Sequence, residues 1–216
     1  MSIIIDGKKK AEQVRAEIAR EVTALLAAGK PRPGLAVVLV GEDPASQVYV
    51  RNKVKQSEEV GFHSIEHRLP ADASPQQVLE LVQQLNQDPA VNGILVQLPL
   101  PKHIDQAPII EAISPAKDVD GLTTVNAGLL TNGQQGLVPC TPLGCILLLR
   151  DVVPSLAGLN AVVLGRSILV GKPAAAKQWA SDSPIPEEAP VTSAIGAGAE
   201  LAFMKVSLIE IGRAHV

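Results

Sequence analysis

Aromatic side chains are scarce in this sequence of 216 residues. Phe, Trp and Tyr together make up 2% of it, and its formal net charge is only −3. A protein that binds nucleic acid needs a basic face for the phosphates, and one that binds single strands adds aromatic side chains on which the bases stack. Basic residues cluster only at Lys8, Lys9 and Lys10. We therefore expect no nucleic-acid partner.

Long apolar runs and cysteines are scarce as well. The longest apolar runs, such as Leu35–Val40, are far shorter than the roughly 20 residues that span a bilayer. The start of the chain, MSIIIDGKKK, places apolar residues before lysines, which is the reverse of a signal peptide. Cys140 and Cys145 have no histidine nearby and make a poor metal site. We expect a cytoplasmic protein with reduced thiols, no metal and no membrane partner.

Strand-like and helix-like patterns alternate along the rest of the chain. Apolar residues recur at helical spacing in some segments, and continuous or alternating apolar runs mark the strands between them. We expect strands over residues 3–5, 35–40, 63–69, 94–98 and 160–164, and helices over residues 8–28, 46–60, 75–87, 105–113 and 142–153. Asp6, Ser74 and Thr141 are the expected helix caps. This alternation predicts an α/β fold with a mostly parallel sheet, in which ligands gather beyond the carboxyl ends of the strands.

A phenol and an amine lie four residues apart in the helix expected after residue 45. Positions three and four apart share one helix face, so Ser46, Tyr49 and Lys53 can line one wall of a cleft. A solvated helix face is the ordinary explanation for an isolated Tyr-x-x-x-Lys pair. The same pair is a signature of short-chain dehydrogenases, but their glycine-rich nucleotide loop precedes it. Here the plausible loop follows far along the chain, which argues against that family.

That loop is Gly165-Arg166-Ser167, directly after the strand expected at residues 160–164. A strand, a glycine turn and a helix start form a phosphate site, because free backbone amides and the helix dipole favour an anion there. The glycine spacing differs from G-x-G-x-x-G and is weak evidence alone. Arg166 and Ser167 strengthen it, since both can bind the extra phosphate of NADP.

Several characteristic stretches occur one after another in this sequence: SQVYVRNKVK, ILVQLPLP followed by KDVDG, and PCTP followed by VVLGRSILVGKP. Together they strongly resemble the bifunctional methylenetetrahydrofolate dehydrogenase/cyclohydrolase family, over about residues 1–176. The resemblance implies a folate-binding catalytic domain over residues 1–138, the start of a Rossmann-type NADP domain over residues 139–176, and a homodimer. It also implies oxidation of 5,10-methylenetetrahydrofolate to the methenyl form with NADP, and hydrolysis of that form to 10-formyltetrahydrofolate.

Matched position by position, the resemblance implies these roles. Lys53 is the catalytic lysine, and burial would have to lower its pKa for it to act as a base. Tyr49 is the cleft tyrosine, Gln97 orients the lysine, and Asp120 holds the pterin ring, with Leu98 and Pro99 also contacting the substrate. Gly165, Arg166 and Ser167 fall on the dinucleotide loop. Asp118 is expected to be only a solvated neighbour of Asp120.

The resemblance stops after Ala176. Residues 177–216 begin with a stretch rich in proline, acid and serine, a composition typical of a linker or of disorder. We therefore expect a truncated or frame-shifted family member whose tail is foreign to the fold and whose NADP binding is severely impaired. The alternative to an active enzyme is a non-catalytic remnant that binds folate or dimerises.

Overall fold

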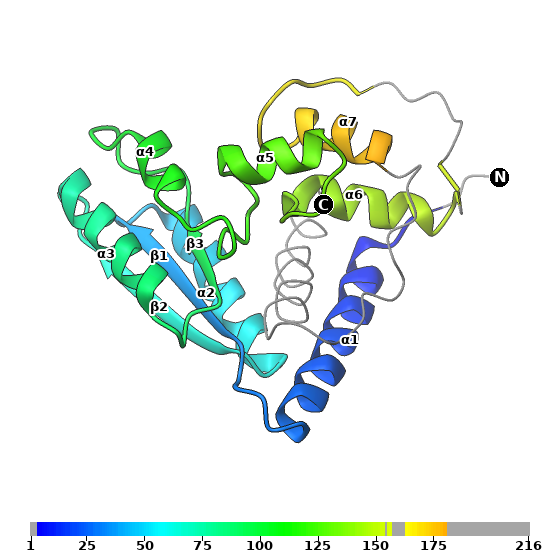
Figure 1. Ribbon diagram of the computed structural model, residues 1–216, viewed down its shortest axis with the longest axis horizontal. Helices are drawn as coiled ribbons and strands as arrows, with labels where there is room; N and C mark the ends of the chain where they lie inside the picture. The colour runs from blue at the N-terminus through cyan, green and yellow to red at the C-terminus, as the bar shows by residue number, and fades with distance from the viewer. Residues whose placement is uncertain (1–3, 154, 157–162, 181–216) are drawn as a thin grey trace.

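The computed structural model describes residues 4–153, 155–156 and 163–180 of the chain (Figure 1). Within this part, helices and strands alternate as the sequence patterns predict. The helices are α1 (Gly7–Ala27), α2 (Pro44–Glu59), α3 (Pro75–Gln87), α4 (Gln106–Glu111), α5 (Thr124–Thr131), α6 (Cys140–Arg150) and α7 (Gly171–Ala180), and the strands are β1 (Gly34–Val40), β2 (His63–Leu69) and β3 (Gly93–Val96).

The three described strands form one parallel sheet in the order β2-β1-β3. β1 lies in the centre, where Val37 pairs with Glu66 on one side and with Leu95 on the other. Every residue of β1 is buried, as its continuous apolar run requires of a strand covered on both faces. The α/β fold with a parallel sheet is confirmed.

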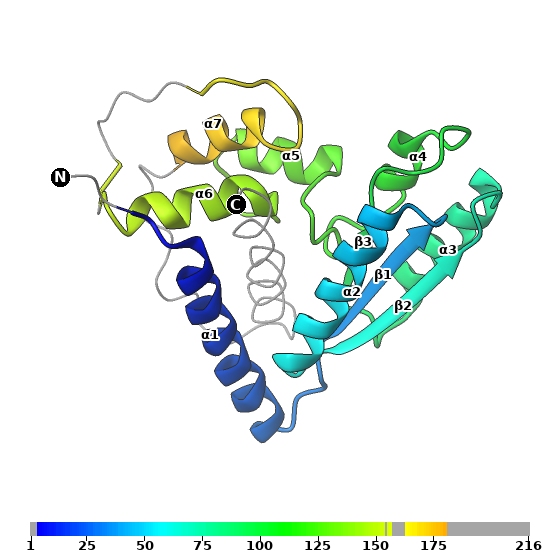
Figure 2. The same cartoon turned by 180° about the vertical axis from the view of Figure 1, so that it is seen from behind.

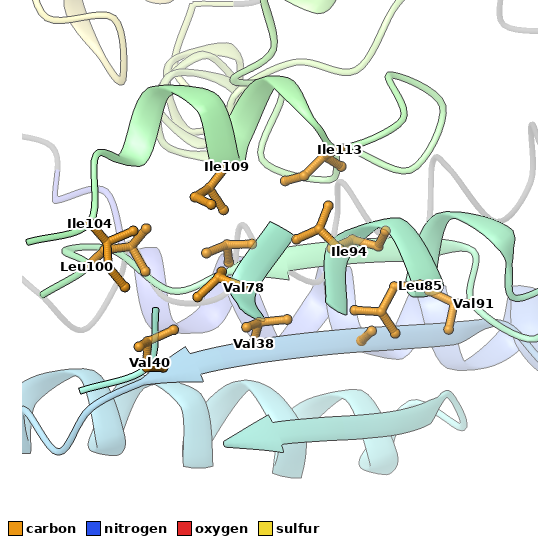
Figure 3. Close-up of a cluster of buried hydrophobic side chains, with 14 residues drawn as sticks. Val38, Val40, Val78, Leu85, Val91, Ile94, Leu100, Ile104, Ile109 and Ile113 are labelled. Atoms are coloured by element: carbon orange, nitrogen blue, oxygen red, sulfur yellow. The ribbon is translucent and has the colours of Figure 1, made fainter. Parts of the chain in front are cut away.

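Alternate residues of β1 face two separate apolar cores. Leu35, Val37 and Leu39 pack with residues of α1 and α2, whereas Ala36, Val38 and Val40 pack with residues of α3, β3 and α4. α2 therefore covers one face of the sheet and α3 the other (Figures 1 and 2). Figure 3 shows the second core, in which the labelled side chains from both layers converge: Val38, Val40, Val78, Leu85, Val91, Ile94, Leu100, Ile104, Ile109 and Ile113.

Two of the three expected helix caps are present. The Asp6 carboxylate accepts a hydrogen bond from the Lys9 backbone N–H at the start of α1, and Ser74 forms a reciprocal capping box with Gln77 at the start of α3. Thr141 is not a cap, because α6 already begins at Cys140 and its N-cap is Pro139, which makes no side-chain bond. α6 also ends at Arg150, three residues before the expected Val153.

Two expected strands are not formed where the structure describes them. Ile4 and Ile5 lie outside any strand, and Ile4 is 90% exposed because no neighbouring strand takes up its backbone groups. Of the strand expected over residues 160–164, residues 160–162 lie outside the described part. Val163 and Leu164 adopt no strand, and Leu164 is 95% exposed.

The second half of the described chain is helical. α7 packs against α5 and α6, and both views show these three helices side by side, away from the sheet (Figures 1 and 2). α5 was not expected from the sequence, although Thr123 caps it by accepting a hydrogen bond from the backbone N–H of Asn126. An ion pair of 2.5 Å between Lys10 Nζ and Asp151 Oδ1 joins the start of α1 to the end of α6.

Candidate functional site

The first part of the site lies on α2, directly after the central strand. Asp43 caps this helix: its carboxylate accepts the Ser46 backbone N–H at 2.7 Å, and this bond holds the pKa of Asp43 below its usual value. The capped turn fixes the helix face that carries Tyr49 and Lys53. Tyr49 is 40% exposed, whereas Ser46 is buried and supports the helix rather than facing a ligand. Lys53 is half-buried.

The second part follows β3. The backbone N–H of Gln97 donates to Val38 O at 2.8 Å, which fixes Gln97 beside the carboxyl-terminal half of β1. Its Nε2 donates to Leu98 O at 2.6 Å, and its Oε1 is buried with no hydrogen-bond partner among the described residues. A buried acceptor without a partner costs about 1–3 kcal/mol, so a donor brought by a ligand would find a favourable position there. Leu98 is half-buried and Pro99 is exposed.

The third part is the loop that contains Asp118 and Asp120, which runs alongside β3. Ile94 N–H donates to Lys117 O at 2.7 Å, and Asp118 forms an isolated parallel bridge with Ile94. The chain turns directly after this bridge, where Gly121 N donates to Asp118 O at 3.0 Å, so Asp120 lies in a turn beside β3. The Lys117 ammonium donates to Leu85 O and Asp88 O at the end of α3, which ties the loop to the neighbouring layer.

The carboxyl group of Asp120 is electrostatically coupled to Lys53. Burial raises the pKa of Asp120, the positive charge of Lys53 lowers it, and the negative charge of Asp118 raises it further. Lys53 is carried by α2 and Asp120 by a loop far along the chain, so the fold brings together two residues that the sequence could only propose.

Asp118 is not the solvated neighbour that the sequence suggested. Only 1% of it is exposed, and its carboxylate accepts hydrogen bonds from Leu122 N, Thr123 N and Asn126 Nδ2 at 2.8–3.1 Å. These donors replace the water that burial removes, which makes a buried carboxylate tolerable. Asn126, 2% exposed, was missed as well. Thr123, three residues before it, was the available signal, since such spacing marks a helix start.

Gly121, next to Asp120, allows the loop to approach the segment before α6. Its φ of +61° lies in the left-handed region, and a Cβ atom there would meet Leu137 O at 2.8 Å, Val138 C at 2.9 Å and Pro139 N at 2.8 Å. The Cys140 thiol also donates to Val119 O at 3.4 Å. Glycine is required here for both reasons, and the close packing holds Asp120 in place.

Gly165, Arg166 and Ser167 lie in an exposed loop before α7. The Ser167 hydroxyl oxygen accepts the backbone N–H groups of Val170 and Gly171, so it caps the helix start. A Cβ atom at Gly171 would strike Gly165 O, so the loop and helix can meet only through glycine. The helix N-terminus and the exposed guanidinium of Arg166 are suited to an anion. Nothing described here joins this loop to Lys53 and Asp120.

Neither a metal site nor a membrane span is found within the described ranges. Over residues 4–153, 155–156 and 163–180, no three His, Cys, Asp or Glu side chains gather as metal ligands. In the same ranges, no helix has the length and apolar character needed to cross a bilayer. Neither Cys140 nor Cys145 forms a disulfide.

Two family profiles match this chain. Residues 5–120 match the tetrahydrofolate dehydrogenase/cyclohydrolase catalytic domain, and residues 139–196 match the NAD(P)-binding domain of the same family. The second match reaches beyond Ala176 into the tail that the sequence analysis sets apart.

Two curated proteins that are similar in sequence to this chain are both named bifunctional protein FolD. A bifunctional protein FolD of Phenylobacterium zucineum is 61% identical over 172 residues, which cover 80% of this chain and 58% of that protein. Another, from Paracoccus denitrificans, is 60% identical over 172 residues, covering 80% and 57%. The chain therefore spans less than two thirds of the length of these curated relatives.

Solved structures agree with this similarity. The bifunctional enzyme FolD of Campylobacter jejuni superposes with a TM-score of 0.80 at 40% identity, over 83% of this chain and 64% of that one. A methylenetetrahydrofolate dehydrogenase-cyclohydrolase of Trypanosoma brucei, solved with NADP and an inhibitor, gives a TM-score of 0.79 at 36% identity, over 83% and 62%.

Proposed function

Because the chain belongs to the tetrahydrofolate dehydrogenase/cyclohydrolase family, we propose that it binds tetrahydrofolate derivatives and acts in one-carbon metabolism. The reactions are oxidation of 5,10-methylenetetrahydrofolate with NADP and hydrolysis of the methenyl product to 10-formyltetrahydrofolate. The observation that carries the proposal is that the fold brings Lys53 of α2 and Asp120 of the loop before α5 within electrostatic reach of each other.

Asp120 and Tyr49 are the proposed pterin-binding residues. A pterin presents paired N–H donors, which a carboxylate accepts well, and these donors would compensate for the water that Asp120 loses on burial. The 40% exposed ring of Tyr49 offers a flat face for stacking. Leu98 and Pro99 would contact the same ligand from the segment after β3.

Lys53 is the proposed catalytic residue for methenyl hydrolysis, and Gln97 its partner. Lys53 would polarise the attacking water and relay protons as the ring opens. The buried Oε1 of Gln97 is an acceptor that can orient an ammonium group or a substrate N–H. The dehydrogenase step needs no strong base, because the folate nitrogen lone pair drives hydride departure, so positioning of the donor carbon supplies most of that catalysis.

Gly165, Arg166 and Ser167 are the proposed NADP-binding residues. The glycine contact between Gly165 and Gly171 and the capped start of α7 are compatible with a bound phosphate, and Arg166 is free to pair with an additional one. NADP would supply the hydride acceptor. Two of the first amides of α7 already donate to Ser167, so a phosphate would be met by the Ser167 hydroxyl proton and by Arg166.

We also propose a cytoplasmic homodimer whose residues 1–138 bind folate and whose residues 139–176 begin the NADP domain. The family match to residue 196 argues against a tail that is foreign to the fold from residue 177 on. Cys140 and Cys145 are not joined in a disulfide, which is compatible with a reducing compartment. Residues 181–216 lie outside the described part of the chain.

A folate-binding remnant without dehydrogenase activity is the second candidate. It is favoured by the exposure of the described segment before the NADP loop, where Leu164 is 95% exposed and neither Val163 nor Leu164 is in a strand. The Rossmann-type site depends on such a strand to aim its loop at the cofactor.

Two assays on the purified 216-residue chain separate these candidates. Loss of methenyltetrahydrofolate absorbance measures hydrolysis, and appearance of reduced nicotinamide from methylenetetrahydrofolate and NADP+ measures the dehydrogenase. We expect hydrolysis above the uncatalysed rate with severely impaired NADP+ reduction. Robust NADP+ reduction would overturn the predicted impairment, whereas loss of both activities with retained tetrahydrofolate binding would identify the remnant. Absence of binding as well would refute the proposed function.

A further inference from the structure

Asp118 is a buried carboxylate to which the proposed reaction assigns no role. Its Oδ1 accepts from Leu122 N at 3.1 Å, and its Oδ2 accepts from Thr123 N at 2.8 Å and from Asn126 Nδ2 at 3.0 Å. These three N–H groups compensate for the burial of the Asp118 carboxylate. These bonds replace the water that burial takes from the carboxylate.

All three donors follow Asp120 in the chain, whereas the backbone of Asp118 is joined to the sheet at Ile94. Gly121 N also donates to Asp118 O at 3.0 Å. Asp120 therefore lies inside a closed turn whose two ends are tied together by the backbone and side chain of Asp118. Its backbone cannot reorient without breaking at least one of these bonds.

Asn126 extends the same network away from the sheet. Its Nδ2 donates to Pro115 O at 2.9 Å as well as to Asp118, and its Oδ1 accepts from Leu137 N at 3.1 Å. Leu137 begins the segment against which Gly121 packs. The Asp118–Asn126 pair thus fixes the turn around Asp120 against α5 on one side and against the approach to α6 on the other.

The charge of Asp118 also acts directly on Asp120. In the described structure, two charged groups influence the Asp120 carboxyl: Lys53 from α2, which lowers its pKa, and Asp118 from the same loop, which raises it. Removing the charge of Asp118 while keeping its shape should therefore change the titration of Asp120. A purely structural cross-link would not have that effect.

We infer that Asp118 is the positioning residue of Asp120, fixing the orientation of the pterin-facing carboxyl through its bonds to Leu122, Thr123 and Asn126. The ligand in this inference rests on the proposed function, but the geometry belongs to the free chain. Asp118 touches no ligand itself and acts on binding only through Asp120.

Three variants test this inference. Asp118→Asn removes the charge and turns one acceptor into a donor that faces the N–H groups around it. Asn126→Ala removes the side-chain bonds of Asn126 to Asp118, Pro115 and Leu137 and leaves the Asp118 charge in place. Asp105→Asn is the control, because Asp105 also accepts a backbone N–H, that of Ala107 at 3.1 Å, but is exposed at the start of α4. Circular dichroism establishes that each variant is folded.

Two measurements follow on each folded variant. The first is the titration of the Asp120 carboxyl carbon by 13C NMR in the free chain, assigned with Asp120→Asn. The second is the Kd for tetrahydrofolate by calorimetry. For Asp118→Asn we expect a lower pKa of Asp120 and a Kd raised about tenfold or more, as for loss of hydrogen bonds to a charged group. For Asn126→Ala we expect an unchanged pKa of Asp120 and a Kd raised about two- to tenfold, because Leu122 and Thr123 still hold the Asp118 carboxylate. Asp105→Asn should leave both quantities unchanged.

A folded Asp118→Asn chain with the wild-type titration of Asp120 and the wild-type Kd overturns the inference. If Asp118→Asn does not fold, Asn126→Ala decides, and a wild-type Kd in that variant overturns the inference. If the wild-type chain does not bind tetrahydrofolate, the proposed function fails. The titration of Asp120 in the free chain then still tests the charge contact between Asp118 and Asp120.

Discussion

Gly121→Ala is predicted to destabilise the chain strongly and to damage the site next to it. Gly121 has φ +61°, a left-handed conformation that costs an alanine about 1–2 kcal/mol. The added Cβ would also lie 2.8–2.9 Å from backbone atoms of Leu137, Val138 and Pro139. Backbone atoms cannot rotate away, and relief of such overpacking costs about 1–3 kcal/mol more. We therefore expect a loss of about 2–5 kcal/mol in the free energy of unfolding.

Gly133→Ala is the matched control, because Gly133 has φ +66° but a Cβ there would meet nothing within 4 Å. It isolates the conformational cost from the collision. The assay is urea unfolding followed by circular dichroism on both variants and the wild type. Equal destabilisation of the two variants would refute the claim that the loop of Asp120 packs closely against residues 137–139.

Three further predictions concern charge and packing. Asp120→Asn should stabilise the chain near neutral pH, because the raised pKa of Asp120 means that its ionised form costs stability in the fold. Urea unfolding measured against pH tests this, and the gain in the free energy of unfolding should vanish below pH 3.8, the usual pKa of the group. Asp43→Asn should keep the cap of α2 at neutral pH but remove a stabilising contribution of the carboxylate. That contribution is present above pH 3.8 and is lost as pH falls through the lowered pKa of Asp43. Acid unfolding measures it, and an unchanged dependence of stability on pH in acid would contradict the cap. Ile18→Ala, at a site 0% exposed in the core under α1, should cost about 2–5 kcal/mol in urea unfolding, whereas a cost below 1 kcal/mol would mean that α1 is not packed there.

The helices and strands whose apolar residues recur at regular spacing could be predicted from the sequence. α1, β1 and α3 lie within a residue or two of their expected bounds, because each buries one face or both faces of a regular element. The pair Tyr49 and Lys53 was also predictable, since helical spacing alone places them on one face.

The remaining features depend on contacts between distant segments. Asp118 and Asp120 are two apart in one loop, and no local pattern distinguishes the buried carboxylate with three donors from the one coupled to Lys53. Ile4 and Ile5 are apolar enough for a strand but have no partner strand in the described structure. Thr141 is a good cap by type, yet Pro139 already allows α6 to begin at Cys140. Tertiary packing decided each of these cases.

The central claim is that Lys53, held opposite Asp120, acts on methenyltetrahydrofolate. Lys53→Met keeps the length of the side chain and removes its amine. Lys55→Met is the control on the same helix, because Lys55 is exposed and its Nζ lies 3.9 Å from Glu59 Oε1 in a surface ion pair. With both variants folded, we expect Lys53→Met to lose methenyl hydrolysis by about a hundredfold or more, in the range for a general acid–base group. Lys55→Met should stay at the wild-type rate. A wild-type rate of hydrolysis in Lys53→Met would contradict the account.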